Sequence, residues 1–220
     1  MSATGPDVAR RPARRWIDRA LFTVLFTLGS ALIRPLFRFR VIGRLRIPPS
    51  RRAILAPNHC SFLDPVALQA AIPRRVTFLM TEEIYRVPWA RWFFRSMGTI
   101  SMPEDRLQLS AMKEGIAAVE RGELLVIFPE GRISRDGELK PGFPGIASIA
   151  ARTGALVVPV HIDGTFRAFP KGARFIRLAQ ITVRFGEPIE LPKGDDVDRN
   201  ALRRATEAIM VAIRDLGVNA

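Results

Sequence analysis

The sequence predicts an α/β fold in which helices flank a mixed, largely parallel sheet. From residue 52 onward, short apolar runs alternate with longer amphipathic segments, as expected of strands joined by helices. Of the 220 residues, 48% are hydrophobic and 25% are charged, which is ordinary for a globular domain and excludes disordered and collagen-like chains. A chain of this length can bury one core without disulfide bonds, and its single cysteine cannot form an internal one.

Six segments have the composition of strands. Most are short runs rich in Val, Ile, Leu or Phe that are bounded by Gly, Pro or charged residues. They are residues 52–57, 75–80, 98–102, 123–129, 155–162 and 180–189. The run at 123–129 carries no charge after its first residue, so we expect it to be a buried strand.

Five further segments are predicted to be helices. They are residues 64–72, 84–97, 107–122, 144–154 and 198–216. The first has a clear start signal, with Asp64 as the expected N-cap and Pro65 at the first helical position. Gly122 and Gly154 are placed to end the third and fourth helices, because glycine readily adopts the left-handed conformation that terminates a helix.

Positive charge is concentrated at the start of the chain. The formal net charge is +13. Residues 1–52 contain 12 arginines and two acidic residues, a net charge of +10, whereas residues 53–220 have a net charge of only +3. A nucleic-acid-binding protein usually carries its charge on the reading surface itself. A basic segment beside an apolar stretch instead favours binding to an anionic membrane, so we predict no nucleic-acid partner.

The apolar stretch is residues 20–33, fourteen residues without a charge. As a helix it would be roughly 21 Å long, which is short for a hydrocarbon core of about 30 Å. We therefore predict a membrane-associating helix that is peripheral or monotopic. A signal peptide and an ordinary core helix remain alternatives, although the arginines that follow residue 33 oppose export. The predicted parts are a membrane-associating segment, residues 1–45, and an α/β domain, residues 46–220.

The first candidate site lies between the strand at 52–57 and the helix at 64–72. His59 is one of only two histidines in the chain, and ligands of open α/β sheets bind at the carboxyl ends of strands. Residues 59–63 could form a turn that brings the Asp64 carboxylate to the His59 imidazole. The carboxylate would then fix the tautomer and leave the other ring nitrogen free to accept a proton. Alternatively, Asp64 only caps the helix and His59 is a polar turn residue.

The second candidate site follows the strand at 123–129. Pro129 ends that strand, and Gly131 would let the backbone approach a ligand closely. Arg132 and Arg135 could make forked contacts with a phosphate group. The alternative interpretation is a solvated turn that carries routine charges.

Together the two sites resemble the glycerolipid acyltransferases, the family of lysophosphatidate and glycerol-3-phosphate acyltransferases. Asn58, His59 and Asp64 match the family's histidine-x4-aspartate block. Residues 128–131, Phe-Pro-Glu-Gly, match its second signature about 70 residues later. Residues 139–142 resemble its lysine-glycine segment, and residues 157–160 resemble its late apolar block. The resemblance extends over roughly residues 40–190.

The resemblance implies transfer of a fatty acyl group from acyl-CoA or acyl carrier protein to the free hydroxyl of a lysophospholipid, with 1-acylglycerol-3-phosphate as the favoured acceptor. His59 would be the general base and Asp64 would orient it. The residues expected to bind substrate are Glu130, Gly131, Arg132, Arg106 and Lys140. No metal or other cofactor is expected besides the acyl donor. The expected location is the cytoplasmic face of the cell membrane, with membrane lipids as partners.

Two departures from the family pattern leave the acceptor headgroup open. Many members have Thr-Arg-Ser after the Glu-Gly pair, whereas this chain has Arg132, Ile133 and Ser134. That variant resembles the acyltransferase domain of bacterial 2-acylglycerophosphoethanolamine acyltransferases. Many members also have an arginine directly after the strand at 98–102, whereas here the nearest is Arg106. Lysophosphatidate, another lysophospholipid and a different hydroxylated lipid are therefore all possible acceptors.

Other interpretations are less favoured. Cys60 is next to His59 in sequence, but neighbouring residues seldom face each other, so we do not expect a nucleophilic cysteine. His161 lies in or beside a predicted strand and is expected to be structural. Two histidines and one cysteine make a zinc site improbable. A lipid-binding module of the same fold without catalytic activity is the main rival hypothesis.

Overall fold

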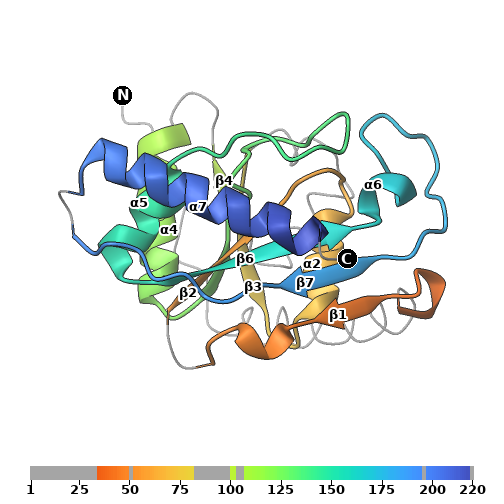
Figure 1. Cartoon of the computed structure of the whole chain (residues 1–220), viewed down its shortest axis with the longest axis horizontal. Helices are drawn as coiled ribbons and strands as arrows, with labels where there is room; N and C mark the ends of the chain where they lie inside the picture. Colours follow the sequence, from red (N-terminus) through yellow and green to blue (C-terminus); the bar gives the residue numbers. More distant parts are fainter. Residues whose placement is uncertain (1–33, 50–51, 82–99, 103–106, 195–196, 219–220) are drawn as a thin grey trace, which may run out of the picture.

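The computed structural model describes residues 34–49, 52–81, 100–102, 107–194 and 197–218. These residues form one seven-stranded sheet in the order β1-β7-β6-β2-β5-β3-β4 (Figure 1). The strands are β1 Arg40–Ile42, β2 Ala53–Pro57, β3 Val76–Thr81, β4 Ile100–Met102, β5 Leu124–Val126, β6 Leu156–Asp163 and β7 Thr182–Phe185. Among the described strands, β6 and β7 pair antiparallel and the other neighbours pair parallel. The predicted mixed, largely parallel sheet is confirmed.

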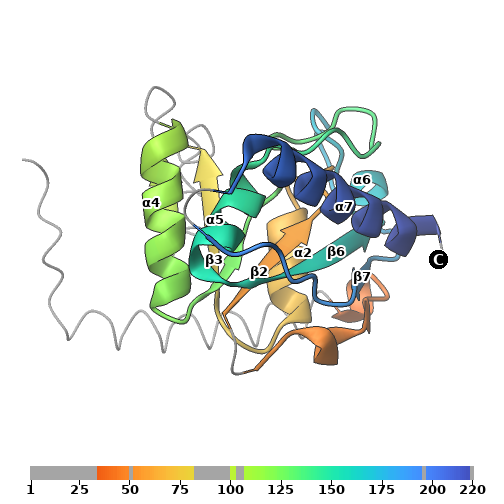
Figure 2. The ribbon, with the colours of Figure 1, turned by 60° about the vertical axis from the view of Figure 1, so that its left-hand side comes forward.

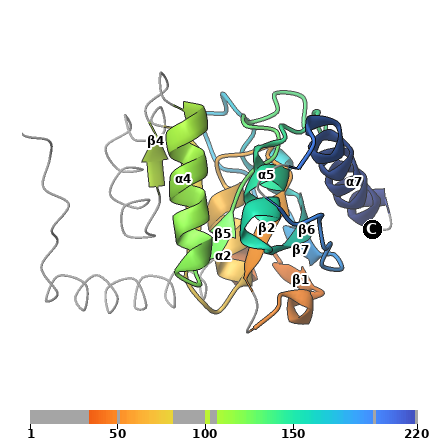
Figure 3. The same cartoon turned by 90° about the vertical axis from the view of Figure 1, so that its left-hand side faces the viewer.

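Helices cover both faces of the sheet. They are α2 Asp64–Ala71, α4 Leu107–Glu120, α5 Gly145–Thr153, the short α6 Thr165–Ala168 and α7 Arg199–Val218, with a 3-10 turn, η1, at Arg44–Arg46. In Figures 1 and 2, α5 and α7 lie in front of the sheet and α2 lies behind it. The view in Figure 3 shows α4, α5 and α7 in succession across the fold.

Two apolar clusters hold these layers together. One cluster joins α2 to the sheet through buried side chains such as Leu68, Phe78 and Phe185. The other joins α4, α5 and α7 to the opposite face through residues that include Ile149 and Ile209. The strands β2 and β6 are central, and their buried runs of Ile, Leu and Val explain why these segments have little alternation in polarity.

Most of the predicted elements are present, with shifted ends. The predicted strand at 123–129 is paired only over Leu124–Val126. Gly154 ends α5 in the left-handed conformation, at φ 64°, as predicted. Three short elements were not predicted, β1, η1 and α6. The predicted helix at 84–97 and the predicted membrane-associating helix lie outside the described residues. Among the residues that are described, no helix is long and apolar enough to cross a bilayer.

The strand β1 changes the predicted division of the chain. Arg40 pairs with Thr182 and Ile42 pairs with Arg184, both in parallel register with β7. Ile181 also donates its backbone N–H to the Phe37 carbonyl at 2.9 Å. The sheet therefore includes residues before the predicted boundary at residue 46, and the α/β unit begins at least as early as Phe37.

Candidate active site

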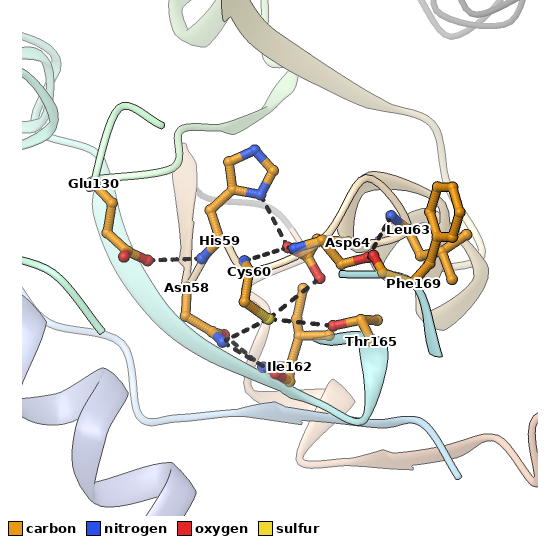
Figure 4. A network of polar contacts seen from close by, with 10 residues as sticks. Asn58, His59, Cys60, Leu63, Asp64, Glu130, Ile162, Thr165 and Phe169 are labelled. Carbon is orange, nitrogen blue, oxygen red and sulfur yellow. Dashed lines mark hydrogen bonds and ion pairs between the residues drawn. The ribbon is translucent and has the colours of Figure 1, made fainter. Parts of the chain in front are cut away.

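The site lies at one edge of the sheet. Because β2, β5 and β6 are parallel, the loops that follow them leave the sheet at the same edge. These loops carry Asn58 and His59 after β2, Glu130 after β5, and Thr165 after β6. Figure 4 shows these side chains converging on the turn that precedes α2.

His59 and Asp64 are in direct contact. His59 Nδ1 lies 2.9 Å from Asp64 Oδ2, the Asp64 residue is fully buried, and only 6% of His59 is exposed. Since an ionised carboxylate can only accept hydrogen bonds, Nδ1 carries the proton that it donates to Asp64. Nε2 is then left with a lone pair that can accept a proton. The predicted contact between the imidazole and the carboxylate is confirmed.

Asp64 does more than hold the imidazole. Its Oδ2 atom also accepts hydrogen bonds from the backbone N–H groups of Cys60, at 2.7 Å, and Ser61, at 2.8 Å. These bonds fold residues 59–64 into a closed turn and compensate the burial of the charge. Asp64 is the first residue of α2 and Leu63 is its N-cap. The prediction of Asp64 as the N-cap is wrong, because its carboxylate binds the amides that precede the helix.

The same bonds limit where an oxyanion could be stabilised. Helix N-terminal amides near residues 60–66 are an obvious source of such stabilisation. In this structure the Cys60 and Ser61 amides donate to Asp64, the Leu63 amide donates to Ser61 Oγ at 3.0 Å, and the Asp64 amide donates to the Ser61 carbonyl. These four amides therefore serve to build the turn.

Glu130 connects the second loop to His59. Its Oε1 atom accepts the backbone N–H of His59 at 2.7 Å, and its Oε2 atom accepts that of Lys140 at 2.9 Å. Only 2% of the residue is exposed, and this burial raises the pKa of the Glu130 carboxyl. The predicted role of Glu130 was acceptor binding. That role stays a prediction, and the geometry adds a positioning role, because both oxygens hold backbone groups of neighbouring loops.

Further contacts fix the orientation of His59. The Ser134 amide donates to the His59 carbonyl at 2.8 Å. The imidazole stacks on the Phe128 ring, with centroids 3.9 Å apart and planes at 22°. Asn58 bridges to β6, since its side chain accepts the Ile162 amide at 2.7 Å and donates to the Ile162 carbonyl at 3.0 Å. His59 is thus held on its ring face, at Nδ1 and along its backbone.

The remaining predicted substrate-binding residues differ in their environments. Gly131 has φ 66°, and a Cβ atom there would come within 3.1 Å of the Phe143 ring. Glycine is therefore required by the turn itself. Arg132 is exposed beside it. The Lys140 ammonium group pairs with Asp136, which raises the pKa of the lysine, and the Lys140 amide donates to Glu130. Arg106 lies outside the described residues.

The two discounted side chains have structural surroundings. His161 Nδ1 donates to the Ile213 carbonyl at 3.1 Å, beneath the last turns of α7, and burial lowers its pKa. Cys60 Sγ lies 3.5 Å from Thr165 Oγ1. Burial, followed by the nearby Asp64 charge, raises the pKa of the Cys60 thiol to about 12. Within the described ranges, no group of His, Cys, Asp and Glu side chains is arranged to hold a metal ion.

Cys60 is expected to resist alkylation in the native protein. At pH 8, a thiol with a pKa of about 12 has roughly 10³-fold less thiolate than an ordinary cysteine. Labelling with iodoacetamide, followed by mass spectrometry, should be at least that much slower in the native chain than in urea. An introduced Glu120→Cys, at an exposed position on α4, provides the reactive surface control. Equal labelling rates for Cys60 in the native and unfolded chains would contradict the burial of this thiol.

The contacts that bear on Cys60, Asn58 and Glu130 could not be read from the sequence. Asn58 and Ile162 are 104 positions apart, and His59 and Glu130 are 71 positions apart. The only sequence signal was that each loop directly follows a predicted strand. The order of those strands in the sheet decides which loops meet.

The fold and the site together define an α/β protein with a carboxylate-oriented histidine at the carboxyl edge of its sheet, an arrangement suited to general-base catalysis. Residues 38–163 match the model of the family described as Acyltransferase. Because this match covers more than half of the chain, the chain belongs to that family.

Similarity to individual proteins agrees with this assignment. The chain is 28% identical over 185 residues to a chloroplastic 1-acyl-sn-glycerol-3-phosphate acyltransferase of Arabidopsis thaliana, covering 82% of this chain and 52% of that protein. It is 32% identical over 165 residues to the corresponding enzyme of Cocos nucifera, covering 72% of this chain and 51% of that protein. The chain thus spans about half the length of these relatives.

A solved structure is also similar. The 1-acyl-sn-glycerophosphate acyltransferase PlsC of Thermotoga maritima superposes with a TM-score of 0.73 and is 26% identical in sequence. The superposition covers 96% of this chain and 83% of that chain. The predicted family and α/β fold are confirmed by these comparisons.

Proposed function

We propose that the protein is an O-acyltransferase that moves a fatty acyl group from acyl-CoA or acyl carrier protein to the free hydroxyl of a lysophospholipid, most favourably 1-acylglycerol-3-phosphate. The observation that carries this proposal is the buried contact of 2.9 Å between His59 Nδ1 and Asp64 Oδ2. Membership of the family and the activity named for the similar proteins support the choice of reaction.

In the proposed reaction, His59 Nε2 takes the proton of the acceptor hydroxyl as its oxygen attacks the thioester carbon. The new carbon–oxygen bond forms and the carbon–sulfur bond breaks. The departing sulfur then recovers the proton from the imidazolium. Asp64 stabilises the imidazolium and keeps Nε2 as the basic nitrogen. The donor is already activated and the acceptor supplies the nucleophile, so no covalent acyl-enzyme is needed. The high pKa of the Cys60 thiol is consistent with such direct transfer.

The loop after β5 is the proposed acceptor-binding region. Glu130 and Ser134 tie this loop to the backbone of His59, and Arg132 and Arg135 are exposed on it. Guanidinium groups bind phosphate oxygens in a forked geometry, so these two arginines are suited to an acceptor phosphate close to the base. We further propose that the enzyme works at the cytoplasmic face of the cell membrane, where its lipid acceptor resides.

The proposal is tested by measuring free-thiol release from acyl-CoA and from acyl carrier protein with a panel of acceptors. We expect release to depend on a lysolipid, with 1-acylglycerol-3-phosphate as the best acceptor. Lysophosphatidylethanolamine is the informative comparison, because the Arg132-Ile133 pair departs from the common family pattern. Preference for that lipid would change only the proposed headgroup of the acceptor and would leave the proposed reaction unchanged. Specific lysolipid binding without thiol release from either donor would favour the non-catalytic alternative.

A further inference from the structure

A basic and apolar loop projects from the fold beside the active site. It comprises residues 171–178, between α6 and β7, with the sequence Lys-Gly-Ala-Arg-Phe-Ile-Arg-Leu. Three of its large apolar side chains are strongly exposed, Phe175 at 78%, Ile176 at 56% and Leu178 at 71%. Its three basic side chains are also exposed. No acidic residue occurs from residue 164 to residue 186, so the loop is uniformly basic.

The loop is anchored at both ends. On its first side, Ser61 Oγ donates to the Phe169 carbonyl at 2.6 Å, and Ser61 forms a bridge with Pro170. The Arg177 amide returns to the Ala168 carbonyl at 2.8 Å and closes the loop on itself. Ser61 belongs to the turn that holds His59 and Asp64, so the loop is connected directly to the catalytic turn.

Sheet topology places the loop where the N-terminal segment enters the fold. β7 runs antiparallel to β6 and β1 runs parallel to β7, so both β1 and β7 begin at the edge where β2 and β6 end. The loop and residues 34–39 therefore lie at the active-site edge, seen at the right in Figure 1. Residues 34–39 directly follow the charge-free stretch 20–33, and they expose Leu36 at 47% beside Arg34 and Arg38.

We propose that residues 171–178 form a membrane-docking loop that seats the active-site edge on an anionic bilayer. The basic side chains match anionic headgroups, and the apolar side chains between them can enter the boundary between headgroups and acyl chains. An acidic protein such as a carrier protein would satisfy the charges. It would not by itself account for three large exposed apolar side chains within four residues. This role of the loop rests on the proposed function, because a docked active-site edge would let a lipid acceptor reach His59 from the bilayer.

An environment-sensitive fluorophore on Leu178→Cys tests insertion in the full-length chain. The buried Cys60 should remain unlabelled. Vesicles of neutral phosphatidylcholine with about one third phosphatidylglycerol should cause a blue shift and an increase in fluorescence. The same fluorophore on Glu120→Cys is the matched control. Glu120 is exposed at the end of α4, just before β5 begins, and so lies at the opposite edge of the sheet. It should not respond.

Two triple variants separate the contribution of the basic side chains to membrane binding from that of the apolar side chains. Replacing Lys171, Arg174 and Arg177 with Gln should weaken partitioning into the anionic vesicles on the order of 10²-fold at low salt, since each basic residue near the surface contributes about fivefold. Replacing Phe175, Ile176 and Leu178 with Ser should weaken partitioning into anionic and neutral vesicles alike.

The response of the fluorophore at position 178 decides whether the loop docks on a membrane or on an acidic protein. No response to vesicles, or a response to acyl carrier protein alone, would overturn the membrane assignment. These measurements require no turnover. If vesicles are bound through this loop but no donor releases thiol, the proposed reaction fails while the docking loop stands.

Discussion

Replacing His59 with glutamine is expected to lower the rate of acyl transfer by roughly 10²–10⁴-fold, the usual contribution of a positioned general base. Glutamine approximates the length of the imidazole and places its amide near the position of Nε2, but it cannot take a proton from the acceptor hydroxyl. The loss should therefore appear in kcat, with a smaller change in KM. The measurement is steady-state thiol release from acyl-CoA with saturating lysolipid.

His59→Gln must remain folded for this result to be informative. Only 6% of His59 is exposed, and its ring stacks on Phe128, so His59→Ala would also remove buried packing. Near-UV circular dichroism and a thermal unfolding midpoint close to that of the unmodified chain would establish that the glutamine variant is intact. Turnover by the intact glutamine variant at the unmodified rate would show that another group accepts the proton.

The second large effect is expected for Asp64→Asn. The substitution removes the charge that fixes the His59 tautomer, and kcat should fall by on the order of 10²-fold or more. It also weakens the turn, because one carboxylate oxygen accepts hydrogen bonds from His59, Cys60 and Ser61. Loss of charge-assisted bonds at a fully buried site should lower the free energy of unfolding by about 2–3 kcal/mol. Urea denaturation measures this change.

Asp136→Asn is the matched control for Asp64→Asn. Asp136 is also bonded to a cation and to backbone, through Lys140 and Glu138, but its side chain is 55% exposed. Water can replace such contacts, so we expect little change in stability or turnover. If Asp64→Asn behaved like Asp136→Asn in both measurements, Asp64 would have neither the orienting role nor the structural role assigned to it.

Local signals predicted the long elements well. The apolar runs of β2 and β6 and the periodic face of α7 are strong patterns because burial selects for them along the whole element. β1 was missed because it is only three residues long and its burial alternates from exposed to partly buried. α6 was missed because four residues are too few for helical periodicity. The pairing partner of β1, the strand β7, is also distant in sequence.

The contacts of the candidate site also include some that the sequence predicted and some that it did not. The contact between His59 and Asp64 spans five residues, so a single turn made it possible, and the resemblance to the acyltransferases favoured it over a simple helix cap. The orientation of the Asp64 carboxylate was not predictable, because it depends on which backbone amides the closed turn leaves without partners. The position of Glu130 beside His59 depends on the tertiary fold. Nothing local indicates that its carboxylate holds the amide of a residue 71 positions earlier.

The chain's own residues therefore determined the class of fold, the family and the histidine–carboxylate pair, since each depends on contacts between near neighbours or on the periodic burial of apolar side chains. The tertiary structure alone decided which loops share the active-site edge. It showed that the Glu130 carboxylate holds the backbone of His59, and it placed the loop 171–178 and residues 34–39 at the active-site edge of the sheet. The physical reason is that strand order and direction, which are set by the packing of the whole sheet, determine where each strand end lies.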